Sequence, residues 1–218
     1  MKKNPEKTAQ TKAALKTAFW TLYQDRPITK ITVQDVTTLA GFNRSTFYQY
    51  FHDVYGVLEE IEDSVINEWE TTFSKNKELL MKENRDEAII EMTVDFYERN
   101  GNYLSVLLSP DGDSSFAQKL KNAMRPKIFA ILQVPDDTVE TSLVFEFASS
   151  GMLAVLTAWY HSANHIPTKD VVELIYALLY RNDMTGVGWG RNKDLVNATV
   201  ATKTLVTNQQ QAGSPKLK

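Results

Sequence analysis

Four neighbouring polar side chains could together recognise nucleic acid. At about 100° per residue, a helix that begins near residue 44 gathers hydrogen-bonding groups on one arc of roughly 140°. The members of this polar face are Arg44, Ser45, Tyr48 and Gln49. A solvated surface helix more often carries Glu and Lys, whereas donors and aromatic hydroxyls suit phosphates and base edges. The pattern therefore favours a DNA contact over the alternative, the polar face of an ordinary helical hairpin.

Two short helices joined by a glycine turn would hold that face in place. Thr32 is placed to cap the first helix, and Asp35 completes an approximate capping box. Gly41 stands where this helix must stop, at a position that favours a residue free to adopt positive φ. Asn43 is placed to cap the second helix. The spacing over residues 31–51 is that of a DNA-reading helix-turn-helix.

The distribution of charge follows the same division. Residues 1–56 contain eight Lys or Arg and four Asp or Glu, a net charge of +4. Residues 57–180 contain ten and 21, a net charge of −11, and residues 181–218 contain six and two, a net charge of +4. A basic head on an acidic body would present the head to DNA while DNA repels the body.

Composition is typical of a cytoplasmic globular protein with one or two domains. The chain has 218 residues, of which 43% are hydrophobic, enough for a sizeable core. It has no cysteine, which excludes disulfides, cysteine nucleophiles and thiolate metal sites. No apolar run approaches the length of a membrane-spanning helix. The basic N-terminus leads into an amphipathic pattern and not an apolar signal core, so we expect neither export nor a membrane partner.

Helical periodicity continues along the chain without a strand pattern and predicts an all-α fold. We expect a first helix over residues 10–24, preceded by a basic arm that could reach the minor groove but more commonly frays. Asp53 is placed to cap a long helix that links head and body. Further helices are expected over residues 85–97, 103–108, 114–133, 136–162 and 168–180, with Pro126 bending or interrupting one of them.

Three regions follow from this pattern. Residues 1–56 form the expected DNA-binding domain, with three helices. Residues 57–182 form a helical domain for sensing and dimerisation. Residues 183–218 form a tail rich in Thr, Asn, Gln and Lys, for which we expect disorder.

The last two predicted helices carry more apolar surface than one side of a small bundle would cover. Their small residues could let another helix approach closely. An internal core of the monomer is the alternative, but we interpret the surface as a homodimer interface. A two-fold dimer would place two heads about one turn of DNA apart, or a multiple of it, on a pseudo-palindrome. The predicted interface residues are Val144, Ala148, Gly151, Val155, Val171, Ile175 and Leu178.

Aromatic side chains could line an effector cavity between helices, although aromatics at helical spacing are more often core residues. The candidate ligand-binding residues are Trp69, Tyr97, Tyr103, Phe116, Phe147 and Trp159. None of them is charged, so they do not indicate the chemistry of an effector.

The best case for an enzyme is the pair His161 and His165, which could share one face of a helix and bind a metal. The pair has no clear third ligand, and histidines at a helix end are more often solvent-facing or capping residues. The sequence has no phosphate loop, nucleophile elbow or dinucleotide fingerprint. We therefore expect no catalysis, no metal and no cofactor.

Residues 31–58 resemble the N-terminal DNA-binding domain of the tetracycline-repressor (TetR/AcrR) family. The motif residues are Thr32, Ala40-Gly41, Asn43, Arg44, Ser45, Thr46, Phe47, Tyr48, Gln49-Tyr50 and Phe51. With the polar face, the resemblance implies DNA contacts for Thr32, Gln34, Asn43, Arg44, Ser45, Thr46, Tyr48, Gln49 and Tyr50. The family usually has Lys where Val54 opens the next helix. Phosphate binding would therefore depend more on Lys30, His52 or the N-terminal arm.

Residues 86–180 resemble, more loosely, the regulatory domain of a Firmicutes subset of this family. The similar residues are Tyr103–Ser109, Gly112-Asp113, Phe116, Gly151 and Trp159. The resemblance implies a homodimeric transcriptional regulator, favouring a repressor, that binds a pseudo-palindromic double-stranded operator and is controlled by an effector. Some such domains answer to a protein partner, so an activator is an alternative. Another alternative, which Val54 favours, is a head that acts mainly in protein–protein interaction.

Overall fold

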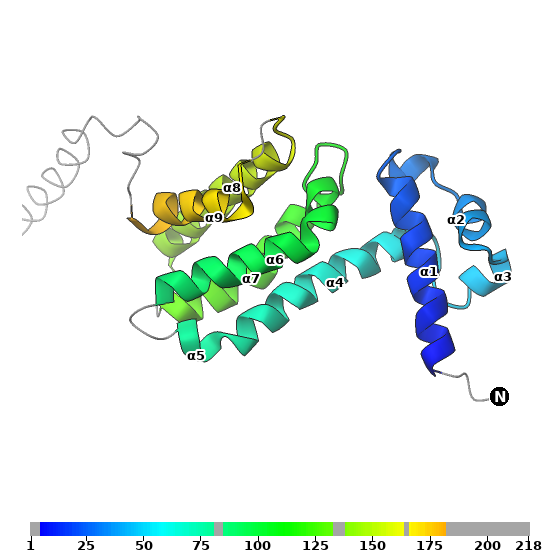
Figure 1. Ribbon diagram of the computed structural model, residues 1–218, viewed down its shortest axis with the longest axis horizontal. Helices are drawn as coiled ribbons and strands as arrows, with labels where there is room; N and C mark the ends of the chain where they lie inside the picture. The colour runs from blue at the N-terminus through cyan, green and yellow to red at the C-terminus, as the bar shows by residue number, and fades with distance from the viewer. Residues whose placement is uncertain (1–4, 81–84, 133–137, 164–165, 182–218) are drawn as a thin grey trace, which may run out of the picture. The chain divides into compact units, whose positions relative to one another are not determined.

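Helices form the regular structure of the protein throughout the ranges that can be described. The computed structural model describes residues 5–80, 85–132, 138–163 and 166–181, and these ranges contain no strand. This confirms the predicted all-α fold (Figure 1). The chain divides into two compact units, residues 1–172 and 173–218. The predicted tail, residues 183–218, lies outside the described ranges.

The head is built on α1 (Pro5–Tyr23), which packs against α2 (Val33–Ala40) and α4 (Val54–Lys75). A 3₁₀ turn (Ile28–Lys30) joins α1 to α2, and α3 (Arg44–Phe47) packs on α2. The first helix begins five residues before the predicted start, because proline is tolerated at a first helical position, where no N–H donor is needed. The fully buried apolar side chains of the head are Leu15, Phe19, Val36 and Phe47.

One long helix, α4, joins the head to the body. Its predicted cap is confirmed, because Oδ1 of Asp53 accepts a hydrogen bond of 2.9 Å from the backbone N–H of Gly56. The helix runs without a break across the predicted boundary at residue 56 and leads to α5 (Lys77–Leu80) (Figure 1). Any movement of the body that tilts α4 therefore acts directly on the head.

The body adds α6 (Arg85–Leu107), α7 (Phe116–Leu132) and α8 (Val139–Tyr160). Helices α6 and α7 both pack against α4, and α8 packs against α7. The chain continues into α9 (Thr168–Tyr176) and a π-helical turn (Ala177–Arg181). The core of the body therefore lies between α4, α6, α7 and α8.

Two helices of the body differ from the predicted pattern. A separate helix at 103–108 was expected, but α6 is continuous through Asn100, whose buried amide donates a hydrogen bond of 3.1 Å to the Phe96 carbonyl. The side chain thus finds its partner inside the helix instead of ending it. At Pro126 the helix was expected to bend or be interrupted; it is not interrupted, because α7 continues through that residue, and the bend stays a prediction.

Candidate nucleic-acid interface

The first helix of the helix-turn-helix is held by a reciprocal cap. The Thr32 hydroxyl accepts a hydrogen bond of 3.2 Å from the Asp35 N–H, and the Asp35 carboxylate accepts one of 3.0 Å from the Thr32 N–H. The hydrogen bond from the Thr32 backbone is the main cause of the lowered pKa of Asp35. Arg26 contacts the same carboxylate at 3.2 Å and ties the preceding turn to this cap. The predicted capping box is therefore confirmed, with Asp in place of Glu or Gln.

Gly41 ends this helix in the left-handed conformation, with φ of 72° and ψ of 28°. Its backbone N–H donates to the Thr38 carbonyl, and the N–H of Phe42 donates to the Thr37 carbonyl at 2.9 Å. These bonds satisfy carbonyls that the end of a helix would otherwise leave unpaired. The predicted positive φ at Gly41 is confirmed, and it sets the direction in which α3 begins.

Asn43 caps α3 through one side-chain oxygen. Its Oδ1 accepts hydrogen bonds from the Thr46 N–H at 2.8 Å, the Ser45 hydroxyl at 2.7 Å and the Thr46 hydroxyl at 3.0 Å. The helical segment is shorter than predicted: it ends at Phe47, and a turn continues to Phe51. Phe47 is fully buried, and its ring centroid lies 5.6 Å from that of Phe51. This packing fixes the segment to the core of the head.

The residues predicted to contact DNA lie on the outer side of this motif. They differ in the hydrogen bonds that their side chains form within the protein. Seven are exposed, namely Thr32, Gln34, Asn43, Arg44, Ser45, Tyr48 and Gln49, and two are half-buried, namely Thr46 and Tyr50. Thr32, Asn43, Ser45 and Thr46 form the caps, and Gln34 donates to the Thr38 hydroxyl at 3.0 Å. Within the described ranges, the structure gives the side chains of Arg44, Tyr48 and Gln49 no hydrogen bond or ion pair. These three are the ones available to a ligand.

Positive charge beside this surface comes from few side chains. Val54 occupies the first position of α4, and His52, whose side chain is 98% exposed, lies 3.2 Å from the Asp53 carboxylate. Lys30 is exposed beside α2. Of the predicted basic arm, Lys2 and Lys3 lie outside the described ranges, whereas Lys7 and Lys12 belong to α1. Lys12 pairs with Glu60 at 2.7 Å, so its charge is partly neutralised.

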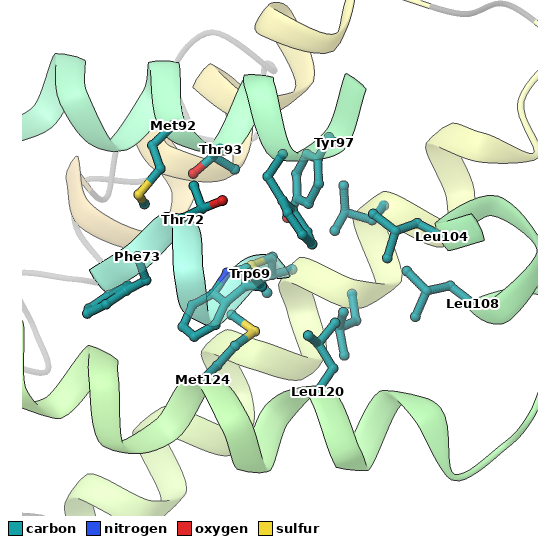
Figure 2. Close-up of a pocket in the computed structure, with 14 residues that line it drawn as sticks. Trp69, Thr72, Phe73, Met92, Thr93, Tyr97, Leu104, Leu108, Leu120 and Met124 are labelled. Atoms are coloured by element: carbon teal, nitrogen blue, oxygen red, sulfur yellow. The ribbon is translucent and has the colours of Figure 1, made fainter. Parts of the chain in front are cut away.

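The body contains a small cavity between α4, α6, α7 and α8. Its free volume is about 30 Å³, room for one or two water molecules. Figure 2 shows side chains of α4, α6 and α7 converging on it, with Trp69 and Tyr97 among them. The rest of the lining is mostly leucine, methionine and phenylalanine, with the hydroxyls of Thr72 and Thr93.

The other four candidate ligand residues lie elsewhere. Tyr103 packs on Trp20 of the head, with ring centroids 4.7 Å apart, and Phe116 is fully buried outside the cavity lining. Phe147 is 82% exposed, and Trp159 donates its indole N–H to the Ile166 carbonyl at 2.9 Å. The structure thus brings only two of the six predicted aromatic residues together around one cavity.

An exposed apolar face runs along the first half of α8. Its members are Val139 (71% exposed), Leu143 (65%), Val144 (67%) and Phe147 (82%). Gly151, one turn further on, has no atom within 4 Å of the position a Cβ would occupy. Of the remaining predicted interface residues, Ala148, Val155 and Leu178 are half-buried, whereas Val171 and Ile175 are buried.

By length and composition α8 could also cross a membrane, contrary to the sequence expectation; no other helix in the described ranges could. One such helix is weak evidence, because core helices of soluble proteins have the same properties. Polar contacts hold α8 to α7: Lys121 lies 2.6 Å from Glu146, and Arg125 donates to the Ser142 hydroxyl at 2.8 Å. One side of α8 is therefore held by α7, while its apolar face is left exposed to solvent, as expected for a helix that packs against another chain.

The proposed histidine pair cannot be compared in full, because His165 lies outside the described ranges. His161 is the exposed C-cap of α8. Within the described ranges, no three His, Asp or Glu side chains are grouped so that they could hold a metal ion.

Sequence reasoning missed a buried carboxyl at the junction of head and body. Glu62 of α4 is fully buried; its Oε2 lies 2.7 Å from Nζ of Lys119, and its Oε1 has no hydrogen-bond donor. Burial raises the pKa of Glu62 to about 7, Lys119 opposes this rise, and Asp113 reinforces it. Its burial could have been predicted from the sequence, because Glu62 falls four residues after Leu58 and so lies on the apolar face of α4.

Comparisons with known proteins agree with this architecture. Residues 84–181 match a TetR family model described as the C-terminal region of transcriptional regulators. No curated protein sequence matches the chain. A TetR transcriptional regulator from Streptococcus agalactiae is similar in structure at 23% identity, with a TM-score of 0.58 over 80% of this chain and 96% of that chain.

Two further solved structures share the fold. The fatty acid degradation regulator FadR from Bacillus halodurans aligns at 14% identity and a TM-score of 0.58, over 82% of this chain and 96% of that chain. The dihydroxyacetone kinase operon activator DhaS aligns at 18% identity and a TM-score of 0.50, over 79% and 95%. These alignments cover more than nine tenths of each solved chain, so the fold is shared over most of its length.

Proposed function

Because residues 84–181 match a TetR family model, we propose that the chain is a TetR-type transcriptional regulator and acts as a cytoplasmic homodimeric repressor. In this proposal it binds a pseudo-palindromic operator through two copies of the head, and an effector at the body releases it. The effector acts by preferring an arrangement in which the two heads have the wrong spacing or tilt.

The proposal rests mainly on three side chains on the outer face of the helix-turn-helix that form no hydrogen bond or ion pair within the described ranges. Arg44 supplies a guanidinium that can donate two hydrogen bonds to a guanine edge. Tyr48, 58% exposed, offers a hydroxyl for a phosphate, and Gln49 offers an amide for a base edge. The caps at Thr32 and Asn43 fix the backbone from which these groups project, so little order has to be gained on binding.

The exposed apolar face of α8 supports the dimer. Exposing four large apolar side chains on one helix face is unfavourable, because each Å² of apolar surface in water costs about 25 cal/mol of free energy. A second copy of α8 related by two-fold symmetry would cover the face with itself, and Gly151 leaves space for close approach. Two linked heads also bind DNA more tightly than one head alone.

The cavity lined by Trp69 and Tyr97 is the proposed effector site. Because its lining is apolar apart from two threonine hydroxyls, it suits an uncharged, largely apolar compound. A volume of about 30 Å³ is far below the roughly 300 Å³ of an ordinary ligand pocket. Binding would therefore have to separate α4 from α6 and α7, and α4 would carry that movement to the head.

Fluorescence anisotropy with DNA fragments tiled around the protein's own gene tests the proposal, at low and at physiological salt. We expect one near-palindromic fragment to bind tightly, with a log-log salt slope of about −0.9 per neutralised phosphate. The Arg44→Ala/Tyr48→Ala double variant serves as the control and should lose this binding. Equal binding by both proteins, or none by either, would contradict the proposal and favour a head that acts in protein–protein interaction.

A further inference from the structure

The junction between head and body contains a group of ionisable side chains that come from separate elements. Glu62 lies on α4, Asp113 on the loop between α6 and α7, and Lys119 on α7. The Tyr23 hydroxyl, at the end of α1, completes the group and faces the backbone amide of Asp113. Glu59, one turn before Glu62 on α4, contributes a further negative charge near Lys119.

Three acidic groups share a single cation here. Lys119 contacts Oε2 of Glu62 at 2.7 Å, while Oε1 of this fully buried carboxyl receives no hydrogen bond. The Asp113 carboxylate lies close enough to Glu62 for its negative charge to raise the pKa of that carboxyl. Two carboxylates cannot bond to each other unless one carries a proton, and neighbouring like charges disfavour ionisation of both. A proton on Glu62 would supply the missing donor.

The position of Asp113 is coupled to both neighbouring helices. Its Oδ1 accepts a hydrogen bond of 2.8 Å from the Ser115 N–H, and its carbonyl accepts one of 3.0 Å from the Phe116 N–H at the start of α7. The preceding Gly112 packs so closely on the end of α6 that a Cβ would lie 2.5 Å from the Val106 carbonyl oxygen. Asp113 therefore cannot move away from Glu62 without moving the loop that joins α6 to α7.

We propose that Glu62 is a proton-operated latch between the DNA-binding head and the body. With the proton in place, Glu62 donates to Asp113 and holds α4, the α6–α7 loop and the end of α1 together. Without it, the Glu62 and Asp113 carboxylates repel each other and the junction loosens. A firmly held head loses less freedom on binding, so DNA affinity is higher when Glu62 is protonated. The effect on DNA rests on the function proposed above.

The direction of the pH dependence follows from how strongly Glu62 binds a proton in the folded protein and in the unfolded chain. Burial raises the pKa of Glu62 from 4.5 to about 7, with Asp113 adding to the rise and Lys119 opposing it. Between these two values the folded protein binds more protons than the unfolded chain, so the free energy of unfolding falls as pH rises. The stabilisation is complete below pH 4.5 and is lost as pH rises through about 7.

The test compares the wild type with Glu62→Gln, whose neutral amide can donate to Asp113 permanently. We would measure affinity for the operator fragment by anisotropy between pH 5.5 and 8.5 at constant ionic strength. The wild-type affinity should fall with rising pH, on the order of fivefold, while the variant should keep its low-pH affinity. Parallel pH profiles for the two proteins would overturn the proposal.

Two more variants distinguish a latch from a merely structural contact. Lys119→Gln removes the cation that favours the Glu62 carboxylate, so the pH midpoint should rise. Asp113→Asn removes the anion that disfavours it while keeping the oxygen that accepts the Ser115 N–H, so the midpoint should fall. Shifts in the same direction, or no shifts, would contradict the proposal.

Thermal unfolding midpoints over the same pH range separate the two hypotheses. Suppose that the wild type binds DNA, and that its affinity and its unfolding midpoint depend on pH in the same way as those of Glu62→Gln. The latch would then be contradicted and the proposed function would stand. If no DNA binds at any pH, the proposed function fails, and with it the effect of the latch on DNA. The unfolding midpoints then still decide whether Glu62 takes up a proton in the folded protein.

Discussion

Trp20 of α1 lies against Tyr103 of α6, with ring centroids 4.7 Å apart and ring planes tilted by 57°. Just after the end of α1, Gln24 donates a hydrogen bond of 2.8 Å to the side-chain oxygen of Asn102. Both contacts join the head to α6, the helix that supplies Tyr97 to the cavity. A displacement of α6 can therefore reach the head through packed side chains as well as through α4.

The ring of Tyr103 should matter more than its hydroxyl. Tyr103→Ala removes the aromatic contact with Trp20, so we expect the free energy of unfolding to fall by about 1–3 kcal/mol. Tyr103→Phe keeps the ring and should change it by less than about 0.5 kcal/mol. Urea unfolding followed by circular dichroism measures both values. A phenylalanine variant as unstable as the alanine variant would show that the hydroxyl carries the stabilisation.

Gly41 is needed for its backbone conformation and not for lack of space. A Cβ at this position would meet no atom within 4 Å, but its φ of 72° is unfavourable for residues with a side chain. Gly41→Ala should therefore reduce the free energy of unfolding by about 1–2 kcal/mol. Gly41→Asn should cost less, because asparagine adopts the left-handed region more readily. Equal losses in the two variants, measured by chemical unfolding, would argue against backbone strain as the cause.

The parts of the site that could be predicted from the sequence depend on neighbours a few residues away. The caps at Thr32, Asn43 and Asp53 and the positive φ of Gly41 each follow from local hydrogen bonding or local sterics. Such features are encoded within one turn of helix, so residue type and spacing are enough to locate them.

The features that sequence reasoning missed depend on distant segments. The partner of Glu62 is Lys119, 57 residues later in the chain, and no local pattern relates the two. The aromatic candidates failed to meet around one cavity for the same reason: Tyr103 faces the head and Phe147 faces away from the body core. Helical spacing predicts which face of a helix a residue occupies but not which helix covers that face.

Phe147 should contribute to association of two copies of the chain. Phe147→Glu places a charge in the centre of the exposed apolar face of α8, so a dimer formed through this face should dissociate. Light scattering coupled to size-exclusion chromatography measures the mass in solution. We expect the mass of a dimer for the wild type and of a monomer for the variant.

A matched control for this experiment is Leu79→Glu. Leu79 is also an exposed apolar residue, 44% exposed, but it lies on α5. This variant should remain dimeric, because α5 is not part of the proposed interface. A dimer that survives Phe147→Glu, or one that Leu79→Glu disrupts equally, would place the interface elsewhere.

Arg44 and Tyr48 should affect DNA binding in different ways. Tyr48→Ala removes a hydroxyl that positions the motif on phosphate, so affinity should fall by a similar factor for operator and unrelated DNA. Arg44→Ala removes a donor to base edges and should cost about 1–3 kcal/mol on the operator but little on unrelated DNA. Anisotropy titrations of each variant with the two DNAs give both ratios. If the two single variants lost the same ratio of specific to unspecific affinity, the division of roles between these residues would be wrong.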